Sequence, residues 1–363
     1  LDLSKYPRMR ISLFLLFATM LVTGCQRLPS TVHLSGQLDD FEEGDSVYLY
    51  RSSDRLNYRE WLAALDTVQL TDRGEFQFTV NATKGDLYQV AGANGFPKFD
   101  DVFLAPGDSL HVHVPVRSDS ISVSYSGTRA KMYGIYDALD SLWQNDTSFQ
   151  KNYYDIARMD IDSAWGLIEN RYNKKMSLVR AHFEKHPESD VMANVIGKNT
   201  YYGDARDYYN YLYYHNYYSK DTFVYYMPEN RYYAFIDTQL LTNPPENYSF
   251  EYMQFLSGYL RDCFNRDYAE LDDSTRYADK FNLMLRTAHA HLSGEALDRA
   301  YLSIADEFGF FLERDGFFEK MDSMDAYFSE NHHSPSNYEK FTFIKSKYDK
   351  LRPGSPAPDL ALP

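Results

Sequence analysis

Cysteine is nearly absent from this sequence, which has two, Cys25 and Cys263, among 363 residues. So few thiols exclude the disulfide framework of small secreted domains, and there is no Cys-x-x-Cys pair to carry redox chemistry or bind zinc. Cys263 follows Tyr259-Leu260-Arg261-Asp262 in a stretch with helical spacing and apolar neighbours. A reactive thiol needs a basic, partly exposed setting, so we expect Cys263 to be buried and inert rather than a nucleophile.

Positive charge is also scarce. The sequence has 37 lysines and arginines against 52 aspartates and glutamates, which gives a formal net charge of -15. A protein binds nucleic acid where its own cations displace the counterions of the phosphate backbone. The charge balance therefore argues against a nucleic-acid partner.

Catalytic sequence motifs are missing as well. The chain has no His-Glu-x-x-His, no Gly-x-Ser-x-Gly and no glycine-rich phosphate loop. His111 and His113 alternate on a predicted strand and point to one face, but a metal centre takes three or four ligands and no third is identifiable. A solvated face is the simpler interpretation, with metal binding as the alternative. The sequence predicts no catalytic residue, no cofactor and no metal site.

Only one long apolar run occurs, Ile11–Val22, and it follows a basic N-terminal stretch. It is short of the roughly 20 residues that span a bilayer as a helix, and it matches the apolar region of a signal peptide. The next residues, Val22-Thr23-Gly24-Cys25, resemble the lipobox of bacterial lipoproteins. The resemblance implies a signal peptide over 1–24, a lipid on Cys25 and a lipidated tether over 25–31. The alternative is a plain signal peptide or a short membrane anchor with a chance cysteine.

Residues 32–128 alternate between apolar and polar side chains, which is typical of strands with one buried face. The alternation is clearest in Phe76-Gln77-Phe78-Thr79-Val80 and in Leu110-His111-Val112-His113-Val114. Turn sequences separate the runs at Asp72-Arg73-Gly74 and at Pro106-Gly107-Asp108-Ser109. We predict an antiparallel β-sandwich or half-barrel of roughly one hundred residues.

From residue 129 to residue 350 the apolar spacing changes to three and four residues, which is typical of helices. The predicted fold class is therefore α+β, with an N-terminal antiparallel β-sandwich followed by an all-helical domain. The clearest later helices are predicted over Phe250–Phe264, Thr275–Leu292 and Glu295–Leu312. Ser189 is predicted to cap another helix, and Ser336 with Glu339 to form a capping box at the start of the last one.

Tyrosine is concentrated in the helical region, with thirteen between Tyr201 and Tyr233. Tyrosine combines apolar area with a polar tip, so these rings could hold a glycan, a peptide or a partner protein. The candidate binding residues are Tyr208, Tyr209, Tyr213 and Tyr214. Packing of one helix against its neighbours is the favoured alternative, because no catalytic carboxylate pair or tryptophan platform accompanies the rings. Trp143 and Trp165, in earlier predicted helices, are expected in the core.

Two segments resemble known families. The Phe-x-Phe after Gly74 and the later Pro106-Gly107-Asp108-Ser109 turn, in this order, resemble the N-terminal β domain of a lipoprotein family common in Bacteroidetes. Gly354-Ser355-Pro356-Ala357-Pro358-Asp359 resembles the opening of peroxiredoxin and TlpA/ResA-like thioredoxin domains, with Leu360 in place of the usual Phe. A proline-rich linker is the alternative for this second segment.

The TlpA-like family has a lipobox, a small β domain, a helical spacer and a thioredoxin-like domain in this order. The resemblance implies that 351–363 are a linker and the start of a thioredoxin-like domain. The chain would then be the N-terminal, non-catalytic part of a thiol-disulfide oxidoreductase, a lipid-anchored protein of the cell envelope that faces the periplasm. It would position the redox domain and its substrate.

The partners implied are the membrane, through the lipid anchor, and disulfide-bearing envelope proteins, with no cofactor. The family's Cys-x-x-Cys does not occur in this sequence, so no catalytic residue is carried over. The competing hypothesis is a stand-alone binding lipoprotein that uses the Tyr-rich helices to hold a glycan, a peptide or a protein.

Overall fold

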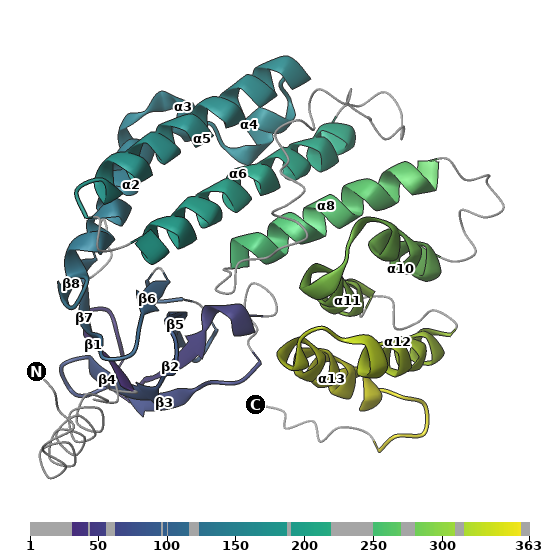
Figure 1. Cartoon of the computed structure of the whole chain (residues 1–363), viewed down its shortest axis with the longest axis horizontal. Coiled ribbons are helices and arrows are strands. Elements are labelled where there is room, and N and C mark those ends of the chain that lie inside the picture. Colours follow the sequence, from purple (N-terminus) through teal and green to yellow (C-terminus); the bar gives the residue numbers. More distant parts are fainter. Residues whose placement is uncertain are drawn as a thin grey trace, which may run out of the picture.

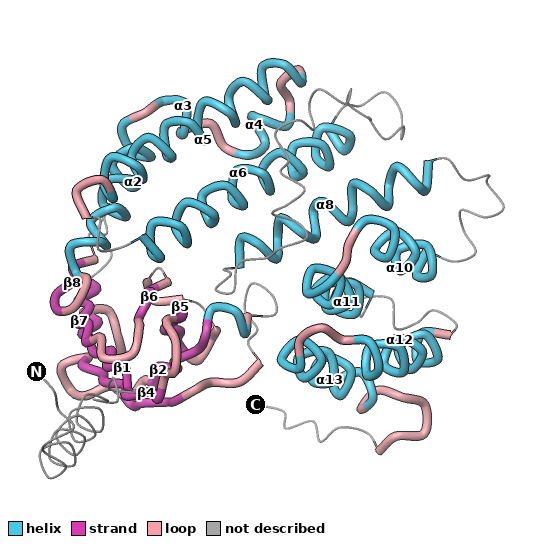
Figure 2. The backbone as a smooth tube through the Cα atoms, in the orientation of Figure 1, coloured by secondary structure: helices cyan, strands magenta, loops and turns pink. Residues whose placement is uncertain are grey.

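Strands come first along the chain and helices follow, which confirms the predicted α+β class (Figure 1). The computed structural model describes residues 31–42, 44–55, 62–95, 97–99, 101–115, 123–186, 190–218, 250–269, 280–308 and 316–356. Figure 2 shows the strands gathered at one end of the molecule and the helices arranged in an arc beside them.

The strands form two four-stranded sheets, ordered β4-β1-β7-β8 and β3-β2-β5-β6. Their bounds are β1 Thr31–Leu38, β2 Ser46–Arg51, β3 Asp66–Gln69, β4 Glu75–Asn81, β5 Asp86–Gly92, β6 Val102–Leu104, β7 Ser109–Val114 and β8 Ser124–Gly127. The pairs are antiparallel except for β1 with β7, which is parallel. The first sheet is therefore mixed, whereas the prediction was an antiparallel sandwich.

The apolar residues of the alternating sequence fill the space between the sheets. Phe76 and Phe78 of β4 are buried, and the residues between and beside them are exposed. Gly36 of β1 lies opposite Phe76, and a Cβ at Gly36 would come within 2.6 Å of that ring. The missing side chain leaves the space that the ring occupies. Gly74 and Gly107, in the two predicted turns, have φ angles of 72° and 90°, which only glycine adopts readily.

The helical part begins directly after β8. A short 3-10 helix, η3 (Ala130–Tyr133), leads into it, and another, η2 (Ser52–Asp54), lies within the sandwich. The α-helices are α2 Gly134–Asn145, α3 Thr147–Gln150, α4 Tyr153–Ala157, α5 Ile161–Phe183, α6 Asp190–Tyr218, α8 Phe250–Ala269, α10 Lys280–His291, α11 Gly294–Phe308, α12 Phe317–Asn331 and α13 Pro335–Asp349. The predicted helix over Phe250–Phe264 is confirmed as α8, and α10 and α11 lie within the other two predicted ranges to within a residue.

The predicted capping box at Ser336 is wrong. Helix α13 starts at Pro335, with Ser334 as the N-cap residue, and no side-chain cap bond is present there. Proline suits the first helical position because its missing N–H would have no partner there. The carboxylate of Asp298 instead accepts the backbone N–H groups of His333 and Ser334, both at 2.8 Å. The other predicted cap, Ser189, lies outside the described residues.

Two hydrophobic cores hold the molecule together, and one of them joins the two parts of the chain. The sandwich core includes side chains from η3, α2, α5 and α6, among them Tyr133, Ile135, Phe183 and Ile196. The Tyr133 hydroxyl donates to the carbonyl of Phe103 in β6 at 2.7 Å. The second core lies among the later helices. Because apolar side chains of helices and strands share one core, the sandwich and the first helices pack as a single body.

Candidate functional site

A pocket of about 320 Å³ lies where the segment around η2 meets α6, α8, α11 and α13. Four cations line it: Arg55 after η2, Arg206 of α6, Arg261 of α8 and Lys340 of α13. The acidic side chain in its lining is Asp306. The chain as a whole is acidic, with a formal net charge of -15, whereas the lining of this pocket has more cations than acids.

Lys340 is buried in the lining of this pocket and connects α13, the last described helix, to the sandwich. Its ammonium donates to the carbonyl of Ser53 at 2.6 Å and lies 3.3 Å from the Asp54 carboxylate. Burial lowers the pKa of Lys340, and Asp54 opposes that shift. A buried charge is stable only with such partners, so Lys340 and Asp54 fix the position of α13 against η2.

The three arginines are held at the wall of the pocket by different contacts. Arg206 donates to Gln254 at 2.6 Å and pairs with Asp207 at 3.2 Å. The guanidinium of Arg261 lies over the ring of Tyr213, with 5.2 Å between them. That of Arg55 lies 4.0 Å from the centre of the Phe250 ring. Stacking on an aromatic face orients a guanidinium and leaves its N–H groups directed sideways.

The remaining wall combines hydroxyl groups with apolar side chains. Ser257 of α8 and Ser303 of α11 hydrogen-bond to each other at 2.7 Å. Met253, Leu302 and Ile344 supply the apolar part of the lining. Cations and hydroxyls beside an apolar wall are suited to a ligand that has a negative group and a hydrophobic body.

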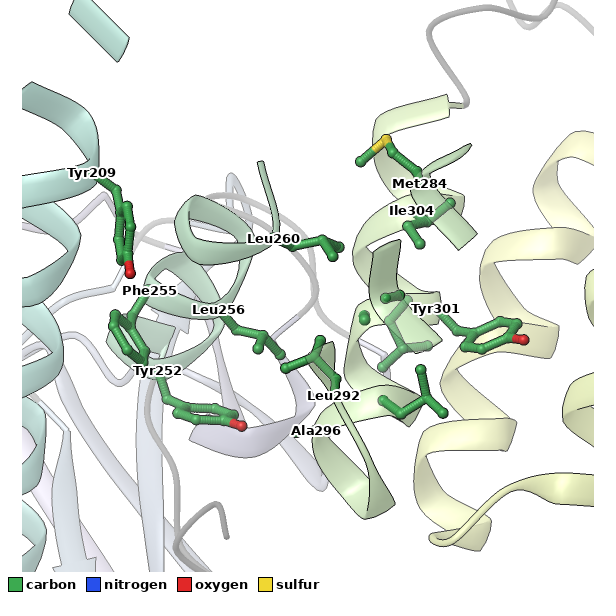
Figure 3. Close-up of a cluster of buried hydrophobic side chains, with 14 of the residues drawn as sticks. Tyr209, Tyr252, Phe255, Leu256, Leu260, Met284, Leu292, Ala296, Tyr301 and Ile304 are labelled. Atoms are coloured by element: carbon green, nitrogen blue, oxygen red, sulfur yellow. The ribbon is translucent and has the colours of Figure 1, made fainter. Parts of the chain in front are cut away.

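The structure separates the four candidate tyrosines. Tyr208 and Tyr209 are buried, and the Tyr208 ring lies 4.1 Å from that of Trp165. Figure 3 shows Tyr209 of α6 beside Phe255 of α8, in the helical core. Tyr213 is exposed and Tyr214 half-buried. The four rings therefore do not form one binding surface. Tyr208 and Tyr209 pack in the helical core, as the alternative interpretation predicts. Tyr213 contacts Arg261, which lines the pocket.

Cys263 is buried, as predicted, and burial raises the pKa of its thiol to about 11. Such a thiol is almost entirely protonated at neutral pH and is a poor nucleophile. Cys25 lies outside the described residues. Trp165 is partly buried against the helical core, but Trp143 is more than half exposed, so the prediction that it lies in the core is wrong.

His111 and His113 lie on the outer face of β7, opposite buried Leu110 and Val112, as the alternation predicts. His111 is hydrogen-bonded to Ser35 at 3.1 Å, and His113 to Asp39 at 3.0 Å. Among the described residues, no three side chains of His, Cys, Asp or Glu are grouped so that they could hold a metal ion.

No family model matches the chain, and no curated protein matches it in sequence.

Among the helices that the structure describes, none is long and apolar enough to cross a membrane.

Sequence reasoning missed the pocket because its cations are far apart in the chain and belong to different elements. Arg55 and Lys340, for example, belong to no sequence motif and line the same pocket only after the whole chain has folded. The one usable signal was a stretch of α8 in which Gln254, Ser257 and Arg261 recur at helical spacing and form a polar stripe on one face.

Proposed function

We propose that this chain is a lipid-anchored protein of the bacterial cell envelope and the N-terminal, non-catalytic part of a TlpA-like thiol-disulfide oxidoreductase. The signal-like segment, the lipobox at Cys25 and the Gly354–Asp359 motif support the proposal. The structural observation that carries it is that both ends of the region contact the sandwich: the first helices share its core, and Lys340 of α13 binds Ser53 and Asp54.

A rigid spacer fixes where an attached domain is held. Strand β1 begins at Thr31, the last residue of the predicted tether, and α13 ends at Asp349, two residues before the predicted linker. Both ends are bound to the same sandwich, β1 through its two neighbouring strands and α13 through Lys340 and Asp54. The end of the tether and the start of the linker would therefore be held at a fixed separation.

In this proposal the chemistry belongs to the thioredoxin-like domain that the motif opens. A thiolate of that domain attacks a substrate disulfide, and a second cysteine resolves the mixed disulfide. Cys263 takes no part, because its thiol is buried and its pKa is raised.

The second candidate function is a stand-alone binding lipoprotein, and the cationic pocket is the observation that favours it. A binding protein needs a recognition site among the sandwich and the helices, whereas a protein that only positions another domain does not. The two functions are compatible if the pocket selects what is presented to the redox domain.

Intact mass of the native protein extracted from membranes tests the proposal. We expect a diacylglycerol-bearing Cys25 at the N-terminus, a Cys25→Ala variant that is not lipidated, and a mass that includes a thioredoxin-like domain. That protein should also reduce the disulfides of insulin in the presence of a thiol reductant. An unlipidated Cys25, or a native protein without a Cys-x-x-Cys, would contradict the proposal.

A further inference from the structure

We propose that the pocket between η2 and α6, α8, α11 and α13 binds a small organic anion, a carboxylate with an apolar side chain. The proposal does not depend on lipidation or on a redox domain, because every group it uses lies in the described body. Its basis is the convergence of cations, hydroxyl groups and an apolar wall from separate elements of the fold.

Charge distribution gives the sign of the ligand. Two of the four cations already have acidic partners, Lys340 with Asp54 and Arg206 with Asp207. Arg261 is held differently, over the ring of Tyr213, and among the described residues no carboxylate lies within ion-pair distance of it. An arginine in this state has N–H groups available for a planar carboxylate.

Tyr213 then acquires a specific role as a positioning residue. Its ring is 44% exposed, yet it lies against Arg261, one turn of α8 beyond Ser257. The stacked ring limits the directions in which the guanidinium points, so a bound carboxylate meets a donor that is already oriented. Pre-orientation of this kind lowers the entropy lost on binding.

The dimensions and the lining give the class of ligand. A volume of about 320 Å³ is at the lower end of small-molecule pockets, and a single residue with a free carboxylate fits that size. In the hydrogen-bonded pair of Ser257 and Ser303, one hydroxyl donates to the other, so one O–H remains to donate to a ligand. Met253, Leu302 and Ile344 supply an apolar surface for a side chain. A highly charged polyanion would leave this apolar surface without a partner.

Calorimetric titration of the purified protein with N-acetylphenylalanine, and with its neutral amide as the matched probe, tests the proposal. We expect the acid to bind and the amide to bind at least tenfold more weakly, since the amide has nearly the same shape but lacks the negative charge and one acceptor oxygen. Arg261→Gln should weaken binding of the acid roughly tenfold, the effect of one charge-assisted hydrogen bond. Tyr213→Ala should weaken it less, and Tyr213→Phe should restore it, because a phenyl ring still supports the guanidinium.

Two further variants keep the test sharp. Asp306→Asn removes the acid in the lining and should strengthen binding of the acid severalfold. Arg158→Gln is the matched control, because Arg158 also lies over a tyrosine ring, that of Tyr218 at 5.6 Å, but is outside the pocket. Equal binding of the acid and the amide, no binding of the acid at millimolar concentration, or unchanged affinity in a folded Arg261→Gln variant would overturn the proposal. None of these outcomes bears on lipidation, so failure here is distinguishable from failure of the proposed function.

Discussion

Gly258 of α8 faces Tyr209 of α6 so closely that a Cβ at Gly258 would lie 2.9 Å from the Cβ of Tyr209. Because Gly258 has no side chain, α6 and α8 approach each other closely at this point. Tyr209 also lies against Phe255, with 6.0 Å between ring centres (Figure 3). The contact is central to the helical core and also borders the pocket.

We expect Gly258→Ala to destabilise the protein by about 1–3 kcal/mol, because the added methyl group forces α6 and α8 apart. Gly166→Ala is the matched control, since Gly166 is an exposed position in α5 and a Cβ there meets nothing within 4 Å. That control should gain about 0.5–1 kcal/mol from helix propensity. Urea unfolding followed by circular dichroism measures both, and a Gly258→Ala variant as stable as Gly166→Ala would refute the close contact.

The tyrosine pairs give a second prediction. Tyr208→Ala should cost about 3–5 kcal/mol of unfolding free energy, because it removes a buried ring that packs on Trp165. Tyr213→Ala should cost no more than about 1 kcal/mol, the loss of one exposed cation-π contact with Arg261. Thermal and urea unfolding compare the two variants. Similar losses at both positions would show that the rings are not divided between core and surface.

A third prediction concerns acid stability. Burial raises the pKa of Asp204 to about 6 from the ordinary 3.8, although Lys175 donates to its carboxylate at 2.7 Å. Between pH 4 and pH 6 the folded protein therefore holds a proton that the unfolded chain has released. The free energy of unfolding should fall as pH rises through this window, by up to about 1.4 kcal/mol per pH unit from this group.

Asp204→Asn removes this titrating group. The difference between the variant and the unaltered protein in the pH dependence of the unfolding free energy therefore gives the contribution of Asp204. Glu169→Gln, at an exposed position on α5, also removes one carboxylate and serves as the matched control. Urea midpoints measured from pH 4 to pH 7 provide the comparison. Parallel pH profiles for the Asp204 variant and the unaltered protein would contradict the assignment.

Thiol labelling tests the state of Cys263. In a Cys25→Ser background we expect the folded protein to react with Ellman's reagent far more slowly than the protein in guanidinium chloride, because the thiol is buried and its pKa is about 11. Adding Ser177→Cys, at an exposed position on α5, should introduce one thiol that reacts at once in the folded state. Rapid labelling of Cys263 itself would show that α8 opens readily.

The buried pair of Lys340 and Asp54 gives the last prediction. Lys340→Met should cost about 3–5 kcal/mol because it leaves Asp54 buried without its cation, and adding Asp54→Asn should recover part of that loss. Arg352→Met is the control, because Arg352 and Asp322 pair at 2.5 Å on the surface, and its loss should stay within about 1 kcal/mol. Full additivity of the two core substitutions in urea unfolding would rule out coupling.

The strands were predictable because their alternation is a local property of the sequence. Phe76 and Phe78 identify a buried face by themselves, and Gly74 and Gly107 identify turns. The parallel partner of β1 was not predictable, because the choice among strands depends on packing across the sheet. Helix α13 shows the same limit, since its start is set by Pro335 together with Asp298, a residue far away in the chain.

The site shows the limit more clearly. Sequence spacing places paired tyrosines on neighbouring faces of a helix, but it does not say which face meets α8, so Tyr208 and Tyr213 looked equivalent. Arg261 gave no signal, because one arginine on a helix is ordinary until Tyr213 and the pocket wall are placed around it. Trp143 was misplaced for a related reason: an aromatic ring at an amphipathic spacing was assumed to face inward.

The parallel pairing of β1 with β7 has a consequence for how the chain folds. β1 lies between β4 and β7 in its sheet, and Ser35 pairs with His111, seventy-six residues later. During synthesis or secretion β1 emerges first. The edge of β1 that pairs with β7 stays unpaired until most of the sandwich has emerged. Pairings between distant segments close slowly, and open strand edges associate with other chains in the interval. The sheet that contains β1 is therefore completed only after β7 has emerged, and until then the free edge of β1 is the kind of surface that a holding chaperone binds.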